Sequence, residues 1–209
     1  MKKTLIAVPC MDNVPARFCQ SLAMLNKMGD NTGICFQIGS LIYSSRENLA
    51  RRAVEYGAEY IMWLDSDMVF EPDLMQKLFE RIEDGTIVSG LYFRRVPPFT
   101  PVLFTKLDID EKGCHWEAPK DIPSDKPFEI AACGFGAVLM PTDACIAVFN
   151  KFGTMFSPIG GIGEDLAFSW RARQCGYKII CDPNIKLGHV GYTVVNAEFY
   201  DAYSKNLKE

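Results

Sequence analysis

The chain has 209 residues, which is the size of one domain or of one domain with a short appendage. Hydrophobic residues make up 48% and charged residues 23% of it, close to the average for soluble globular proteins and enough for a large buried core. The formal net charge of −4 argues against a broad nucleic-acid interface, because such surfaces are basic. It leaves room for one phosphorylated small molecule bound through local groups.

The N-terminal segment MKKTLIAVPCMDN has two lysines before an apolar stretch, an arrangement also found in signal peptides. Here the apolar stretch is short, Pro9 interrupts it, Asp12 follows soon after, and no small-residue cleavage site is evident. We therefore expect a buried first strand. Because no stretch approaches the roughly 18 uncharged apolar residues of a membrane span, we expect a cytoplasmic protein without a transmembrane segment.

In the first half of the chain, short apolar runs alternate with segments of helical periodicity. Strands are predicted at 4–10, 33–39, 60–64 and 86–93, and helices at 14–28, 44–56 and within 71–85. The run YIMWL at 60–64 is apolar throughout, as expected of a strand that is covered on both faces. This order predicts an α/β fold with a mostly parallel, doubly wound sheet, and such sheets bind ligands at the carboxyl ends of their strands.

The second half is less regular. Residues 94–104 are rich in proline and typical of a loop, and the polar residues 108–127 are expected to form an exposed excursion. A strand is predicted at 128–141, where internal glycines indicate a bulge or a close backbone approach. The remaining predicted elements are a helix at 142–152, a glycine loop at 160–163, a helix that follows it and a strand at 177–181.

The eight cysteines contain no C-x-x-C pair, so the sequence does not support a zinc ribbon or a thioredoxin-like motif. Most of them lie in apolar stretches such as AACGFGAVLM. We expect small buried thiols in a reducing compartment.

Two aspartates, Asp65 and Asp67, directly follow the predicted strand at 60–64. Carboxylates avoid burial unless they are paired or bind a metal. Two of them at positions i and i+2 on a strand-to-loop corner can converge on one hard cation, Mg²⁺ or Mn²⁺, together with phosphate oxygens of a ligand. The alternative is an aspartate cap for the helix that begins near Pro72, which explains at most one of the two.

Three other positions carry groups suited to chemistry. Glu164 and Asp165 follow the glycine loop at the start of a helix; the helix dipole alone favours acids there, but a mobile loop beside two carboxylates suits a lid with a catalytic base. His189 follows the last predicted strand and is either structural or a partner of the aspartates in a metal site. Arg46 follows the second strand, where a guanidinium either meets a phosphate or a base, or ends a helix in solvent.

Together these segments resemble a glycosyltransferase of the GT-A fold. The motifs that carry the resemblance are, in chain order, IAVP, an arginine-bearing helix, YIMWLDSDM, CGFGAVLMP, GEDLAFSWRARQCGYKI, and D-P followed by H-x-G. They span about residues 4–191, nearly the whole chain. Their order is most similar to that of the large family of nucleotide-sugar transferases that includes synthases and other polysaccharide-building enzymes.

The resemblance implies a GT-A, Rossmann-like, mostly parallel sheet flanked by helices within a single domain, 1–209. Residues 1–95 would form the nucleotide-sugar-binding half and 96–195 the acceptor and catalytic half. The tail at 196–209 is expected to form a short helix with Phe199 and Tyr203 packing back.

The resemblance also implies roles for individual residues. A divalent metal, Mn²⁺ or Mg²⁺, would be held by Asp65, Asp67 and His189, with Asp67 as the more direct ligand. Asp165 would be the catalytic base, and Glu164 would assist at the acceptor.

On the donor side, the resemblance implies a UDP- or GDP-sugar as ligand. The expected contacts are Pro9, Asp12, Arg46, Asp65 and Ser66, with Asn13 as an alternative to Asp12 for the base. Family members often show Arg-Asn together, whereas this chain has Arg-Glu-Asn from position 46, so Asn48 is left unassigned. The acceptor would be a hydroxyl of a glycan, a lipid or a protein, which would attack the anomeric carbon of the donor with inversion.

Three other functions account for part of the sequence pattern. An aspartyl-phosphate hydrolase also places LDSDMVF after a strand, but its nucleophile strand normally opens the domain, and here some 60 residues come first. A nucleotidyltransferase on the same fold would need an N-terminal glycine-rich phosphate loop, and AVPCMDNVPAR has no glycine. A non-catalytic module for sugar nucleotides or glycans would bind without turnover.

Overall fold

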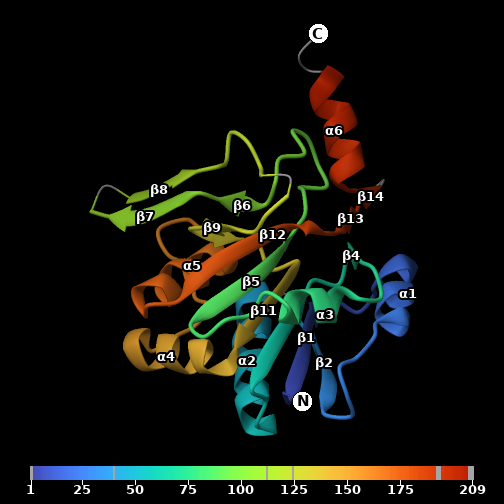
Figure 1. The fold of residues 1–209 in the computed structure, drawn as a ribbon. Helices are drawn as coiled ribbons and strands as arrows, with labels where there is room; N and C mark the ends of the chain where they lie inside the picture. Colours follow the sequence, from blue (N-terminus) through green and yellow to red (C-terminus); the bar gives the residue numbers. More distant parts are fainter. Residues whose placement is uncertain (1, 40, 112, 124, 192–193, 207–209) are drawn as a thin grey trace.

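The structure, a computed structural model, describes residues 2–39, 41–111, 113–123, 125–191 and 194–206 (Figure 1). Its central element is a seven-stranded sheet with the order β2 (Thr32–Ile38), β1 (Thr4–Cys10), β3 (Tyr60–Leu64), β11 (Ala137–Pro141), β5 (Thr86–Leu91), β12 (Lys178–Lys186) and β9 (Phe128–Ile130). All of these strands run in one direction except β11 and β9, which run against the others. The prediction of a mostly parallel α/β sheet is confirmed.

Helices cover both faces of this sheet. One face carries α2 (Ile42–Tyr56), α4 (Thr142–Phe152) and α5 (Glu164–Gln174), and the other carries α1 (Ala16–Met24) and α3 (Leu74–Phe79). Each helix turns an apolar stripe inward, as Leu49, Ala50 and Ala53 of α2 do with no exposed surface. Covered on both sides, the four residues from Ile61 to Leu64 of β3 are fully buried, as the apolar run predicted.

Two helices are shorter than their periodicity predicted. α1 does not reach the limits 14–28, because Pro15 occupies its N-terminal cap and the backbone becomes extended at Leu25. α3 occupies only part of 71–85, and the residues after it form turns rather than helix. The end of α2 is as predicted: Gly57 follows its last residue with a left-handed φ of 69°.

The continuous strand predicted at 128–141 is wrong, because the chain breaks into β9, β10 (Ala132–Cys133) and β11. Gly134 and Gly136 lie between β10 and β11, where Tyr92 approaches the backbone. A Cβ atom at Gly134 would collide with the Tyr92 hydroxyl, which also accepts a hydrogen bond from the Gly136 amide at 3.3 Å. The close backbone approach that these glycines indicated is confirmed.

Residues 108–127 are mostly exposed, as predicted, but they include regular structure. β7 (Lys106–Asp110) and β8 (Gly113–Glu117) pair as an antiparallel hairpin. Leu107 is fully buried and packs with residues of α5 in a small separate core. The last central strand also exceeds its predicted limits of 177–181, since a register shift after Asp182 allows β12 to continue through Pro183.

Short strands at the carboxyl end of the sheet complete the fold. β14 (Val194–Val195), β13 (Gly188–Val190) and β4 (Met68–Val69) form a three-stranded sheet, and β6 (Leu103–Phe104) pairs with β10. The predicted tail helix is present as α6 (Ala197–Asn206) (Figure 1). Phe199 and Tyr203 both pack on Phe99. Positions 207–209 of the predicted tail lie outside the described residues.

Two predictions about the chain as a whole can be compared with the structure. None of the helices in the described ranges is both long and apolar enough to cross a membrane. All eight cysteines are free thiols: Cys10, Cys133, Cys145 and Cys181 are buried, three are partly buried, and Cys19 is exposed.

Candidate functional site

A cavity of about 440 Å³ opens at the carboxyl end of the central sheet. Its lining residues come from the ends of β1 and β3, from α2 and α5, and from the segments after β2, β5 and β12: Pro9, Cys10, Met11, Gly39, Ile42, Arg46, Asp65, Ser66, Asp67, Arg95, Glu164, Asp165 and His189. Every site residue predicted from the sequence is in this set except Asp12 and its alternative Asn13, which are both exposed. Four carboxylates and three basic side chains thus line one cavity.

On one side of the cavity, Arg46 joins two carboxylates from distant parts of the chain. Its Nη2 donates to Asp65 Oδ1 at 2.7 Å, and its Nε donates to Glu164 Oε1 at 3.0 Å. The guanidinium is only 2% exposed and lies over the rings of Trp63 and Phe135, at 5.6 and 5.2 Å. Arg46 is therefore a buried link between the end of β3 and the start of α5, and the alternative of a helix end in solvent is wrong.

Asp165 lies beside this link in the first turn of α5. Its Oδ1 accepts a hydrogen bond from the Leu166 amide at 2.8 Å. Burial, reinforced by the negative charge of Glu164, raises the pKa of Asp165 to about 7, against the opposing effect of Arg46. A carboxyl group with a pKa in this range can accept a proton near neutral pH and release it again, as a general base must.

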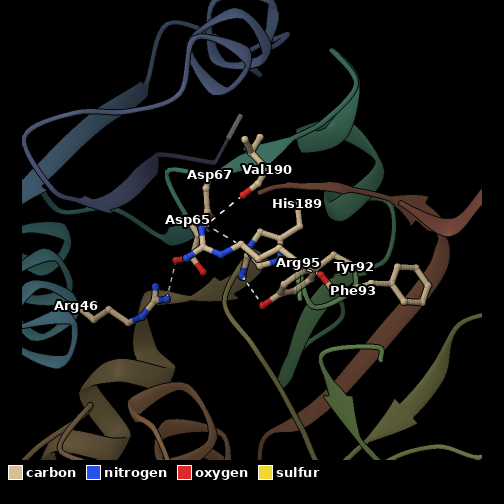
Figure 2. A network of polar contacts seen from close by, with 9 residues as sticks. Arg46, Asp65, Asp67, Tyr92, Phe93, Arg95, His189 and Val190 are labelled. Carbon is tan, nitrogen blue, oxygen red and sulfur yellow. Dashed lines mark hydrogen bonds and ion pairs between the residues drawn. The ribbon is translucent and has the colours of Figure 1, made fainter. Parts of the chain in front are cut away.

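On the other side, the pairing of β4 with β13 brings Asp67 and His189 together. His189 lies opposite Met68 in this pairing, and the Val190 amide donates to Asp67 O at 2.8 Å. The two side chains consequently face each other, with His189 Nε2 3.3 Å from Asp67 Oδ2 (Figure 2). Arg95 Nη1 reaches the same carboxylate oxygen at 2.5 Å and Val190 O at 3.5 Å.

The contacts of His189 show which ring nitrogen donates to the backbone. Its Nδ1 lies 2.8 Å from Phe93 O, a carbonyl that can only accept, so Nδ1 carries a proton and Nε2 is the atom directed at Asp67. Burial disfavours charge on both side chains, but their mutual contact outweighs it. As a result the pKa of His189 is raised and that of Asp67 is lowered, the latter also by Arg95.

The Asp67 and His189 pair fits a divalent metal. A carboxylate oxygen and an imidazole nitrogen are directed at one point, and the carbonyl of Phe93 orients the imidazole from behind, as outer-shell partners of metal-bound histidines do. Asp65 is turned toward Arg46 instead. Among the described residues, no group of three or more His, Cys, Asp or Glu side chains converges as a metal site. Of the three predicted ligands, Asp67 and His189 are adjacent, and Asp65 is not directed at the same point. Phosphate oxygens and waters commonly fill the other positions around Mg²⁺.

Comparisons with known proteins address the fold. No protein-family model matches the chain, and no curated protein matches its sequence. The solved structures that match include A197 from STIV, with a TM-score of 0.66 and 17% identity over 93% of both chains. They also include GalNAc-T7 with UDP, GalNAc and Mn²⁺, with a TM-score of 0.64 and 10% identity over 91% of this chain and 44% of that one.

The fold is of the GT-A type. At these identities the likeness concerns the fold alone, and the chain spans less than half the length of the GalNAc-T7 chain. On this GT-A fold the cavity lies where a doubly wound sheet binds ligands, outside the carboxyl ends of β1 and β3.

Two residues around the site were missed in the sequence. Arg95 lies in the proline-rich segment that was predicted only as a loop; the available signal was a pair of arginines directly after a strand end.

The second residue, Glu47, stands between Arg46 and Asn48, where the glycosyltransferases that the sequence resembles often have arginine and asparagine together. Its Oε2 accepts hydrogen bonds from the amides of Met155 and Phe156, each at 3.0 Å, and so fixes the segment that leads to the glycine loop. Asn48 is not part of the cavity lining.

Proposed function

We propose that this protein is a metal-dependent glycosyltransferase that moves a sugar from a nucleoside-diphosphate sugar to an acceptor hydroxyl, with inversion. The observation that carries the proposal is the content of one cavity. It combines Asp67 and His189, a pair suited to a divalent metal, with Asp165, a carboxyl group whose pKa is about 7. The fold likeness to a protein solved with UDP, GalNAc and Mn²⁺ supports the same assignment.

In the proposed complex, Asp67 and His189 hold Mn²⁺ or Mg²⁺. The metal, when bound, supplies positive charge that offsets the negative charge developing on the leaving diphosphate. Pro9 and Ser66 face the nucleotide from the ends of β1 and β3, and Asp12 or Asn13 at the rim contacts the base. Arg46 is almost fully buried, so in the proposal it influences the ligand mainly through Asp65, the carboxylate that it holds in place.

Asp165 is the proposed general base. It takes the proton from the acceptor hydroxyl while that oxygen forms a bond to the anomeric carbon and the bond from this carbon to the diphosphate oxygen breaks. The negative charge of Glu164 helps to keep the pKa of Asp165 high, which makes its carboxylate a stronger base. The glycine loop at 160–163 precedes both acids and, in the proposal, closes over the donor to exclude water.

Binding and turnover test the proposal separately. Thermal shift is measured with UDP-sugars and GDP-sugars, with and without Mn²⁺, and hydrolysis of the sugar nucleotide is followed in parallel. We expect Mn²⁺-dependent stabilisation that is lost in Asp67→Ala. We expect Asp165→Asn to keep donor binding and to slow hydrolysis by about 10²- to 10⁴-fold.

A matched control is Asp143→Asn, since Asp143 is also an acid in the first turn of a helix but lies outside the cavity. It should leave binding and hydrolysis unchanged. Phosphatase activity without nucleotide binding, abolished in Asp65→Asn, would favour the aspartyl-phosphate hydrolase instead. Binding of a sugar nucleotide without any turnover would favour the non-catalytic module.

A further inference from the structure

Arg95 contacts the carboxylate of Asp67, the side chain proposed to coordinate the metal. Its Nη1 contacts Asp67 Oδ2 at 2.5 Å, and the same oxygen is the one that faces His189 Nε2 (Figure 2). A cation coordinated by Asp67 and His189 would therefore meet the guanidinium of Arg95 at close range. Two positive groups this close repel each other strongly, so Arg95 and the metal compete for Asp67.

The backbone that carries Arg95 is held in place on both sides. Phe93 O accepts from His189 Nδ1, and the Phe93 ring stacks on Tyr200 of α6 with centroids 4.5 Å apart. At the far end of the segment, Phe99 packs against two further aromatic side chains of α6. The freedom to move belongs to the Arg95 side chain, which is 50% exposed and has a long flexible stem.

The other basic side chains that line the cavity already pair with neighbouring groups. Among the described residues that line it, the basic side chains are Arg46, Arg95 and His189. Arg46 is buried and pairs with Asp65 and Glu164, and His189 is held by a hydrogen bond at Nδ1 and an ion-pair contact at Nε2. Arg95 is thus the lining guanidinium that can follow a ligand, in a cavity whose four carboxylates would otherwise repel a diphosphate.

We propose that Arg95 is an exchangeable counter-cation. Without donor it pairs with Asp67 and withholds that carboxylate from a divalent cation. When the cation and a nucleoside diphosphate bind together, the guanidinium turns to the diphosphate oxygens, for which its planar fork of donors is well suited. This inference rests on the proposed function, and it makes the binding of metal and of nucleotide mutually dependent.

Isothermal titration with Mn²⁺ alone, and with UDP at saturating Mn²⁺, tests the exchange in wild type and Arg95→Gln. Removing the competing ion pair should tighten the binding of Mn²⁺ alone by about two- to fivefold, the range for a half-exposed pair. Losing the charged contact to the diphosphate should weaken UDP binding by about 10- to 100-fold. The variant should therefore bind metal better and nucleotide worse.

Arg94→Gln is the matched control, because it removes the same charge from the adjacent residue, whose exposed side chain makes no hydrogen bond or ion pair with the described residues. It should leave both affinities near those of wild type. Equal Mn²⁺ affinity in wild type and Arg95→Gln, or unchanged UDP affinity, overturns the exchange while the proposed function stands. Failure of both proteins to bind Mn²⁺ and UDP overturns the proposed function, and the exchange with it.

Discussion

Asp65 and Asp67 follow the end of the same strand and are separated by one residue. Each contacts an arginine, but the two arginines differ greatly in exposure. Arg46 is 2% exposed and bridges Asp65 to Glu164, whereas Arg95 is 50% exposed and reaches Asp67 from a surface segment. A buried pair has no competing water and keeps its geometry, but an exposed pair is screened and readily exchanged. The same local motif thus has a fixed side and an exchangeable side.

The difference follows from what surrounds each arginine. α2 positions Arg46 against Trp63 and Phe135, so the guanidinium is almost fully shielded from solvent. Arg95 extends from a segment that is anchored by its aromatic residues rather than by its charged ones. In the proposed function, the fixed side aligns groups for chemistry, and the exchangeable side responds to the ligand that enters the cavity.

The largest expected effect comes from breaking the fixed side. Arg46→Met leaves Asp65 and Glu164 without their cation, and we expect it to lower the free energy of unfolding by about 3–5 kcal/mol, as measured by urea denaturation. Adding Asp65→Asn and Glu164→Gln to this variant should restore much of the loss, because the uncompensated charges are then removed. A loss below about 1 kcal/mol in the single variant would contradict the difference between the two sides.

A second, intermediate effect concerns pH. Since burial raises the folded-state pKa of Asp165 to about 7, above its ordinary value, the stability that this group contributes is fully present below about pH 4, falls as the pH rises, and is lost once the pH passes about 7. Asp165→Asn removes the buried charge, so its gain in the free energy of unfolding should be larger at pH 8 than at pH 5 by on the order of 2–3 kcal/mol. Urea denaturation at the two pH values measures this.

Asp143→Asn serves again as the control and should show no such pH dependence. An equal effect of Asp165→Asn at pH 5 and pH 8 would mean that the pKa of Asp165 is not raised. The same titration predicts that donor hydrolysis in wild type increases as pH rises through about 7, because the base must be deprotonated to accept a proton.

The smallest expected effect comes from the exchangeable side. Arg95→Met removes a half-exposed ion pair and should change the free energy of unfolding by less than about 1 kcal/mol. Thermal denaturation should place it close to Arg94→Met and far from Arg46→Met. A destabilisation as large as that of Arg46→Met would show that Arg95 is as fixed as Arg46.

The sequence predicted the central part of the fold and most of the cavity lining. Apolar runs and glycine stops located β1 and β3, and the rule that doubly wound sheets bind ligands at the carboxyl ends of their strands placed Asp65 and Asp67 at the site, while Pro9 came from the resemblance. The acids of α5 and His189 were found by their order along the chain. Local signals sufficed for Pro9, Asp65 and the acids of α5, because each lies at or directly after the end of a strand or at the start of a helix.

The parts that were missed depend on contacts between distant segments. The position of Arg95 follows from aromatic contacts of its segment with α6, some 100 residues later, and no local pattern reports such contacts. The hairpin at 106–117 has only a short apolar alternation, which its many polar residues obscured. Asp12 was predicted as a base contact through the resemblance; its side chain is exposed, and its role stays a prediction.

The position of β11 determines where the chain can be cut into two fragments. This strand comes from the second half of the chain but pairs with β3 on one side and with β5 on the other, both from the first half. A fragment ending near residue 95 would lack the strand that joins its own two pieces of sheet. Split versions of this protein should therefore be cut in the largely exposed stretch 118–121. Both fragments should be produced together, because neither contains a complete sheet.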